Sequence, residues 1–154
     1  MKISAGILPY RIKDGQLEVY LVYPGGPQNK KNRLWGLAKG AVESGEDLVG
    51  AAKREFAEET SFDPPSELIP IGTIQQRTDK IVHGWAGESP YLEKPVSNII
   101  EIEVYGKLVK VPEISDGRYF TVDEALDNII FGQKEFVTNL VEVLKIQRKI
   151  ENKS

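Results

Sequence analysis

The sequence predicts an α+β fold in which helices cover both faces of a mixed β-sheet, an α/β/α sandwich. Two observations indicate it. Apolar residues alternate with period two in strand-like segments at residues 1–13, 16–23 and 98–105, whereas residues 44–60 and 133–150 carry apolar residues at helical spacing. Strands therefore come first, then a helix, then more strands and finally helices, an order typical of layered α+β domains.

The composition is that of one globular domain. The chain has 154 residues, of which 40% are hydrophobic and 28% charged, and its formal net charge is −3. We expect a single domain over residues 1–154, and the acidic balance argues against a nucleic-acid-coating protein. There is no cysteine, which excludes disulfides and thiolate chemistry. Because no apolar run approaches the roughly 20 residues of a membrane span and no signal-peptide core begins the chain, we expect a cytoplasmic protein without a membrane partner.

The first elements are a strand pair and a loop. Asp14-Gly15 is a hairpin turn signal between the two strand-like segments, and Pro9 fits an edge strand or a bulge. The glycines and prolines of residues 24–34 predict a loop there. Its basic residues can contact an anionic ligand or simply be solvated: Lys30, Lys31 and Arg33. Trp35, which follows the loop, can pack in the core or stack on a base.

Residues 44–60 predict the central helix. Ser44 can cap its first turn, where Glu46 and Asp47 would meet the positive end of the helix dipole. An apolar stripe predicts the buried face: Leu48, Ala51, Ala52 and Phe56.

Three glutamates share one face of this helix. Glu55, Glu58 and Glu59 stand at i, i+3 and i+4, where neighbouring Cβ atoms lie only about 5–6 Å apart. Like charges at this spacing repel, so the arrangement does not stabilise the helix by itself. A divalent cation reverses that effect, because Mg²⁺ binds hard oxygen ligands together with phosphates. A solvated helix face is the other interpretation of the three residues taken alone.

The wider spacing around these glutamates is more specific. Six residues form one spaced pattern: Gly40, Glu46, Arg54, Glu55, Glu58 and Glu59. Five residues separate the glycine from the first glutamate, seven separate that glutamate from the arginine, and two separate the Arg-Glu pair from the Glu-Glu pair. This pattern resembles the Nudix box, and the chain is similar to Nudix hydrolases. It departs at Ser61, where the family has a glycine that ends the helix in a left-handed conformation that serine adopts at some cost. It also departs at Ala38, where the family often has proline.

The resemblance implies a Nudix-type sandwich and a metal-dependent hydrolysis. Glu55, Glu58 and Glu59, with the carbonyl of Gly40, would bind Mg²⁺ or Mn²⁺. Two further box residues would support the box by pairing with each other: Glu46 and Arg54. The reaction implied is attack of water on a phosphoanhydride bond, for which bound metal ions neutralise charge and activate the water.

The general base is open. Within the box, Glu58 is a candidate, with Glu55 beside it. In many family members an acidic residue outside the box adds a ligand or a base, and the polar face of the segment at residues 98–105 offers Glu101 and Glu103. We prefer Glu101, although a solvated strand face explains both residues equally well.

Substrate contacts are expected beside the box and on the next strands, at residues 68–78 and 80–86. Phosphate contacts are expected from Lys39 with Arg77 or Lys80. His83 can contact a phosphate, or it can be packed or hydrogen-bonded within its strand. Two aromatic residues can stack on a base or pack in the core: Trp85 and Tyr91. Residues 80–86 are also similar to a strand of diadenosine tetraphosphate hydrolases.

The C-terminal third contains a hairpin or loop at residues 106–111 and a short strand at residues 118–120. Thr121 and Glu124 form a capping-box signature that predicts a helix start. Residues 133–150 then predict an amphipathic helix that covers one face of the sheet.

The resemblance implies a nucleotide substrate, either a dinucleoside polyphosphate or a nucleoside triphosphate, including an oxidised one. A non-catalytic nucleotide-sensing module and hydrolases of ADP-ribose, sugar nucleotides or RNA 5′ ends are the alternatives, the last disfavoured by the acidic balance. A homodimer is left open. The sequence fixes neither the leaving group, nor the phosphorus that is attacked.

Overall fold

The computed structural model describes residues 1–25 and 34–153, with side chains up to residue 147. A six-stranded mixed sheet forms its centre: β1 (Lys2–Lys13), β2 (Gln16–Pro24), β3 (Ala38–Ala41), β4 (Ile69–Arg77), β5 (Lys80–Glu88) and β8 (Ile114–Thr121). The strand order is β4-β5-β1-β2-β8, and β3 pairs with β1. The β1–β5 pair is parallel and the other pairs are antiparallel, so the sheet is mixed as predicted.

Strand β1 changes partner halfway along one edge. Its first half, Ser4–Ile7, pairs with β3, and its last residues, 10–13, pair with β2. Pro9 lies between these two stretches, where a missing N–H does least harm to the ladder. The expectation of an edge strand was therefore wrong, because β1 lies in the middle of the sheet. At the change of partner, however, Pro9 has no paired residue in β2 or β3, as a proline on an edge strand would have none on its open side.

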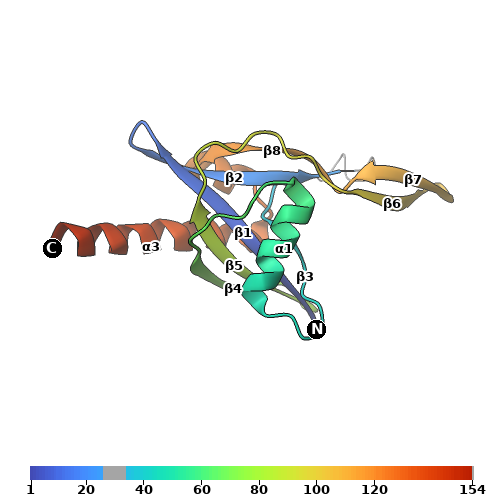
Figure 1. Ribbon diagram of the computed structural model, residues 1–154, viewed down its shortest axis with the longest axis horizontal. Helices are drawn as coiled ribbons and strands as arrows, with labels where there is room; N and C mark the ends of the chain where they lie inside the picture. The colour runs from blue at the N-terminus through green and yellow to red at the C-terminus, as the bar shows by residue number, and fades with distance from the viewer. Residues whose placement is uncertain (26–33, 154) are drawn as a thin grey trace.

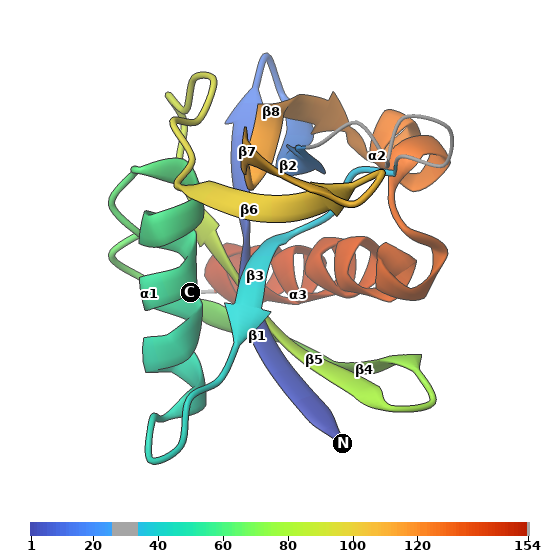
Figure 2. The same cartoon turned by 90° about the vertical axis from the view of Figure 1, so that its right-hand side faces the viewer.

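Helices cover both faces of the sheet (Figure 2). Helix α1 (Leu48–Thr60) buries Ala51, Ala52 and Phe56 against one face. Helix α2 (Val122–Asn128), the short 3₁₀ helix η2 (Phe131–Gln133) and helix α3 (Lys134–Lys153) lie on the other face. The predicted α/β/α sandwich is thus confirmed.

Helix α1 begins and ends at backbone positions that its sequence sets. Its N-cap is Asp47, not Ser44 as expected, because Gly45 takes a φ of 81° and turns the chain before the helix can start. It ends at Ser61, which has the left-handed φ of 66° expected of the residue that replaces glycine. The Ser61 hydroxyl donates to the carbonyl of Val96, which ties the helix end to the following loop.

Strands β6 (Ile99–Val104) and β7 (Lys107–Pro112) form a separate two-stranded hairpin that projects from the body (Figure 1). Alternation at residues 98–105 correctly predicted a strand. However, this strand lies outside the main sheet, and side chains such as Leu108 are 73% exposed.

The C-terminal region follows the sequence closely. Thr121 accepts from the N–H of Glu124, whose carboxylate accepts from the N–H of Thr121, which is the predicted capping box.

Some residues considered in the sequence lie outside the part that the structure describes. They are Lys30, Lys31 and Arg33 of the predicted loop, and the side chain of Ile150. In the described part of the chain, no helix has the length and apolar character to cross a membrane.

Candidate active site

Glycine at position 40 lets helix α1 approach strand β3. A Cβ atom there would lie 2.0 Å from Oε2 of Glu55, so only a residue without a side chain leaves room for that carboxylate. Because Gly40 pairs with Ala5 of β1, the Glu55 carboxylate is held directly above the sheet. The strand and the helix of the box therefore meet at this glycine.

Arg54 joins the box loop to the helix. Its Nε and Nη2 donate to the two carboxylate oxygens of Glu46 at 2.7 and 2.9 Å, the pair that the spacing indicated. Nη2 also donates to the carbonyl of Ala41 at 3.0 Å. Nη1 donates to Glu55 at 2.8 Å and to Glu58 at 3.2 Å. These hydrogen bonds lower the pKa of Glu46 to about 2.

Glu59 is buried in the middle of the acidic group. It is 5% exposed, and it accepts a hydrogen bond from the backbone N–H of Lys39. Burial, followed by the charges of Glu113 and Glu55, raises the pKa of Glu59 to about 9. A buried carboxyl among other carboxyls is the kind of strained electrostatic arrangement that clusters at functional sites.

Glu113 is the acidic residue outside the box that the structure brings to this group. It lies between β7 and β8, where its N–H donates to the carbonyl of Asn98 at 2.9 Å. Its side chain hydrogen-bonds Glu59, while burial and the charges of Glu55 and Glu58 raise the pKa of Glu113. Glu113 therefore interacts with all three helix carboxylates.

Glu101, the preferred candidate outside the box, does not join them. It is exposed on the projecting hairpin, in register with Lys110 of β7. Glu103, on the same strand face, is also exposed. Sequence reasoning missed Glu113 because it follows Pro112 between two strands, where no period or motif distinguishes it. The carboxylates are brought together by a tertiary contact, which only the path of the hairpin provides.

The residues fit a hard divalent cation by their chemistry. Among the described residues, no three acidic or histidine side chains are arranged as a ready set of metal ligands. The donors that gather here are nevertheless carboxylate oxygens, the ligand type that Mg²⁺ and Mn²⁺ prefer. Burial, followed by the repulsion between these carboxylates, raises the pKa values of Glu59 and Glu113, and a cation would relieve the repulsion. Arg54 bonds only Oε1 of Glu55 and Oε2 of Glu58, so the second oxygen of each carboxylate remains for a cation.

The three basic residues expected to contact phosphate do lie together. Lys39, Arg77 and Lys80 line a cleft of about 540 Å³ that also reaches Gly40. A smaller cavity of about 200 Å³ lies on the other side of Lys39 and is lined by Glu59, Glu113 and the buried amide of Gln133. Lys39 thus stands between the carboxylates and the basic cleft.

The other residues proposed for substrate binding lie apart from this group. Nδ1 of His83 is 2.8 Å from the hydroxyl of Thr73 on the neighbouring strand, so His83 is hydrogen-bonded within the sheet. Trp85 packs against the core under α1. Tyr91 is 90% exposed on a loop. None of these three residues lines the basic cleft or the adjoining cavity.

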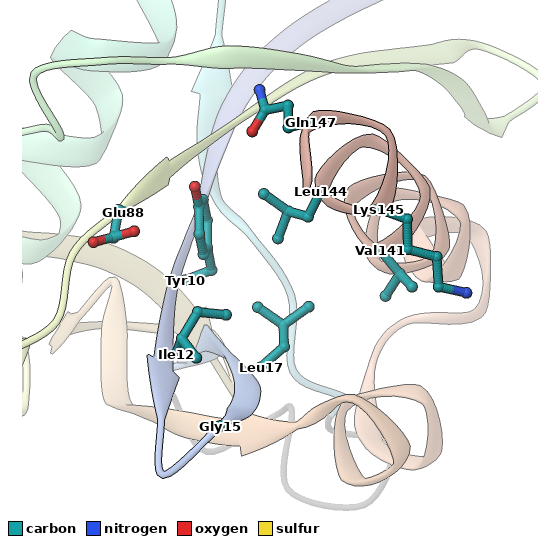
Figure 3. Close-up of a pocket in the computed structure, with 9 residues that line it drawn as sticks. All are labelled: Tyr10, Ile12, Gly15, Leu17, Glu88, Val141, Leu144, Lys145 and Gln147. Carbon is teal, nitrogen blue, oxygen red and sulfur yellow. The ribbon is translucent and has the colours of Figure 1, made fainter. Parts of the chain in front are cut away.

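A cavity of about 360 Å³ at the other end of α3 has a different character (Figure 3). Its lining includes Tyr10, Leu17 and Leu144, together with one acidic residue, Glu88, and one lysine, Lys145. One lysine and one carboxylate give little net attraction for phosphates, so the basic cleft near Gly40 is the better candidate for a phosphorylated ligand.

The site is thus a group of carboxylates beside a basic cleft, built on an α/β/α sandwich. The NUDIX domain model matches residues 2–140. The chain therefore belongs to the NUDIX family.

Solved structures with this fold cover nearly the whole chain. The Ap4A hydrolase of C. elegans, in a binary complex, has a TM-score of 0.66 at 20% identity, with 94% of this chain and 98% of that chain covered. The NUDIX domain of Shewanella oneidensis NrtR, complexed with ADP ribose, has a TM-score of 0.65 at 19% identity, covering 92% and 87%. A NUDIX hydrolase-like protein of Listeria monocytogenes has a TM-score of 0.70 at 14% identity, covering 96% and 97%.

One curated relative matches a shorter stretch. The chain is 42% identical over 59 residues to uncharacterized protein L534 of Acanthamoeba polyphaga mimivirus, which is 38% of this chain and 19% of that protein. The match thus spans about a fifth of the relative's length.

Proposed function

We propose that the chain is a Nudix hydrolase that cleaves a phosphoanhydride bond in a nucleoside diphosphate linked to another group. The observation that carries this proposal is the gathering of four carboxylates around Lys39 and Gly40, next to a basic cleft. Membership of the NUDIX family supports the same reaction class. The products would be two phosphorylated fragments, with the water oxygen on one of them.

The metal would be Mg²⁺ or Mn²⁺, held by Glu55, Glu58 and Glu59 with the carbonyl of Gly40. It would supply charge neutralisation on the phosphates and activation of the attacking water. Arg54 holds Glu55 and Glu58 in place through one nitrogen and Glu46 through two others, so it would orient both ligands. Lys39 would contact the phosphate nearest the metal.

A carboxylate would accept the proton of the attacking water. Glu58 was the candidate within the box. Glu113 is a second one, because it interacts with all three helix carboxylates and is itself half-buried. Burial and neighbouring carboxylates raise the pKa of Glu113, which makes its carboxylate a stronger base. Glu101 is no longer supported as a base, because it stays on the hairpin.

The test is product release from a panel of dinucleoside polyphosphates, nucleoside triphosphates, ADP-ribose and sugar nucleotides, with mass detection. We expect turnover with Mg²⁺ or Mn²⁺ and none in a chelator. Glu58→Gln should reduce kcat at least about 100-fold, because one charged ligand is lost. Full activity of that variant would contradict the assignment.

A nucleotide-sensing module without turnover is the second candidate. The hydrogen bonds from Arg54 to Glu55 and Glu58 favour it, because they occupy one oxygen of each of two carboxylates that a metal would need. Tight binding of a nucleotide from the same panel, with no product under any divalent metal, would select this function over hydrolysis.

A further inference from the structure

The basic cleft contains more positive charge than one phosphate requires. Four basic side chains line it, and no acidic residue does: Lys2, Lys39, Arg77 and Lys80. The strand register explains how three of them meet. Lys2 of β1 lies directly beside Lys80 of β5, and Lys39 lies opposite Gly6 of β1. Because side chains alternate along strands, Lys2, Lys39 and Lys80 point to the sheet face opposite α1.

Among the described residues, these cations have few close acidic partners, although Lys39 lies near Glu59 and Glu113. Arg77 approaches Asp79 only to 3.8 Å, and both side chains are more than half exposed. In the described part of the chain, Lys2, Lys39 and Lys80 form no ion pair within 4.0 Å. Like charges directly opposite each other in a sheet are destabilising.

A buried hydroxyl also lines the cleft. Ser4 lines the cleft between β1 and β3, and it is 6% exposed. Its hydroxyl forms no hydrogen bond to any described residue. A buried hydroxyl without a partner carries a desolvation cost. An acceptor oxygen in the cleft would remove that cost, and the surrounding lysines favour an anionic one.

The cleft continues from the carboxylates rather than standing apart. The Lys39 side chain lines both the cleft and the cavity that holds Glu59 and Glu113. If one phosphate of a substrate lies at the carboxylates, the following phosphates of the same substrate would therefore lie in the cleft. Each added phosphate would meet another cation there, whereas a neutral sugar would gain little from four positive charges.

We propose that this cleft binds phosphates beyond the two that the cleaved anhydride joins, so that the substrate class is a nucleotide with three or more consecutive phosphates. Nucleoside triphosphates and dinucleoside tetraphosphates belong to this class, and ADP-ribose and sugar nucleotides do not. The cleavage of such a substrate rests on the proposed hydrolysis at the box carboxylates, whereas phosphate binding in the cleft does not. Ser4, Arg77 and Lys80 are then residues that set specificity.

The kinetic test compares kcat/KM for a dinucleoside tetraphosphate and for ADP-ribose. Lys80→Ala should lower kcat/KM about tenfold for the tetraphosphate and less than about threefold for ADP-ribose, because a charge-assisted contact is lost for the first alone. Lys13→Ala, a lysine at the exposed end of β1, is the matched control and should change neither. An equal loss on both substrates would overturn the proposal.

A binding test separates the cleft from the reaction. Calorimetry with inorganic tripolyphosphate and metal-free protein should show binding that Lys80→Ala weakens about tenfold and Lys13→Ala leaves unchanged. Equal binding by all three proteins, or no binding by the wild type, would contradict phosphate binding in the cleft, whatever the hydrolysis assays show. Binding without turnover of any substrate would instead refute the proposed function and support the cleft. The melting temperature of Lys80→Ala should not fall, because the substitution removes a repulsion.

Discussion

At the scale of single residues, Gly40 and Glu59 set the electrostatics of the site. Gly40 leaves the space that the Glu55 carboxylate fills, and Glu59 is buried among acids that raise its pKa. Both features cost stability or conformational freedom, and neither improves the packing of the core. Such local costs are typical of residues retained for chemistry.

Gly40→Ala should separate activity from stability. The added Cβ would force the flexible Glu55 side chain away, a shift that costs little folding free energy. A displacement of this size near the reacting atoms should lower kcat about 100-fold. Gly50→Ala is the matched control, because its Cβ would displace the Asp47 carboxylate, which lies outside the acidic group. Equal kcat values for both variants would count against the role of Gly40.

Glu59 predicts how the stability of the metal-free protein depends on pH. Its pKa is about 9 in the folded protein and 4.5 in a free side chain, so the folded state binds the proton more tightly. The stabilisation is complete below about pH 4.5 and is lost as the pH rises toward 9. Between pH 5 and 9, the melting temperature should therefore fall more for the wild type than for Glu59→Gln, by roughly 5 °C. Parallel curves from thermal melts in a chelator would contradict this.

At the scale of elements, the short helix η2 holds the segment that leads into the box. Gln133 is fully buried at the end of η2, and its Oε1 accepts from the N–H of Leu37 at 3.0 Å. Its Nε2 donates to the side chain of Gln76 on β4 at 3.0 Å. One amide therefore links η2, β4 and the segment before Lys39, which positions that lysine between the cleft and the carboxylates.

Gln133→Leu should destabilise the protein and misplace Lys39. The substitution leaves the Leu37 N–H and the Gln76 amide without partners, at a cost of about 2–4 kcal/mol in the free energy of unfolding. Denaturant melts measure that loss. Gln147→Leu, on the exposed part of α3, is the control and should change stability by no more than about 0.5 kcal/mol. Wild-type stability of Gln133→Leu would show that the amide is not a structural link.

At the scale of the whole molecule, the sequence predicts the sandwich and the helix carboxylates well, because both rest on local periodicity and on the spacing of the box. The Glu46–Arg54 pair and the left-handed Ser61 follow from that spacing as well. Glu113 could not be predicted, because its approach to Glu59 depends on where the β6–β7 hairpin leaves the sheet. The start of α1 was misplaced, because the positive φ of Gly45 overrides the capping tendency of Ser44.

The most direct test of the account is a calorimetric titration of the protein with Mn²⁺. We predict that the wild type binds Mn²⁺ and that Glu58→Gln and Glu59→Gln each weaken binding at least about tenfold. Glu142→Gln, an exposed glutamate on α3, should bind as the wild type does. The central claim would be contradicted by a wild type that binds no Mn²⁺, or by box variants whose affinity is unchanged.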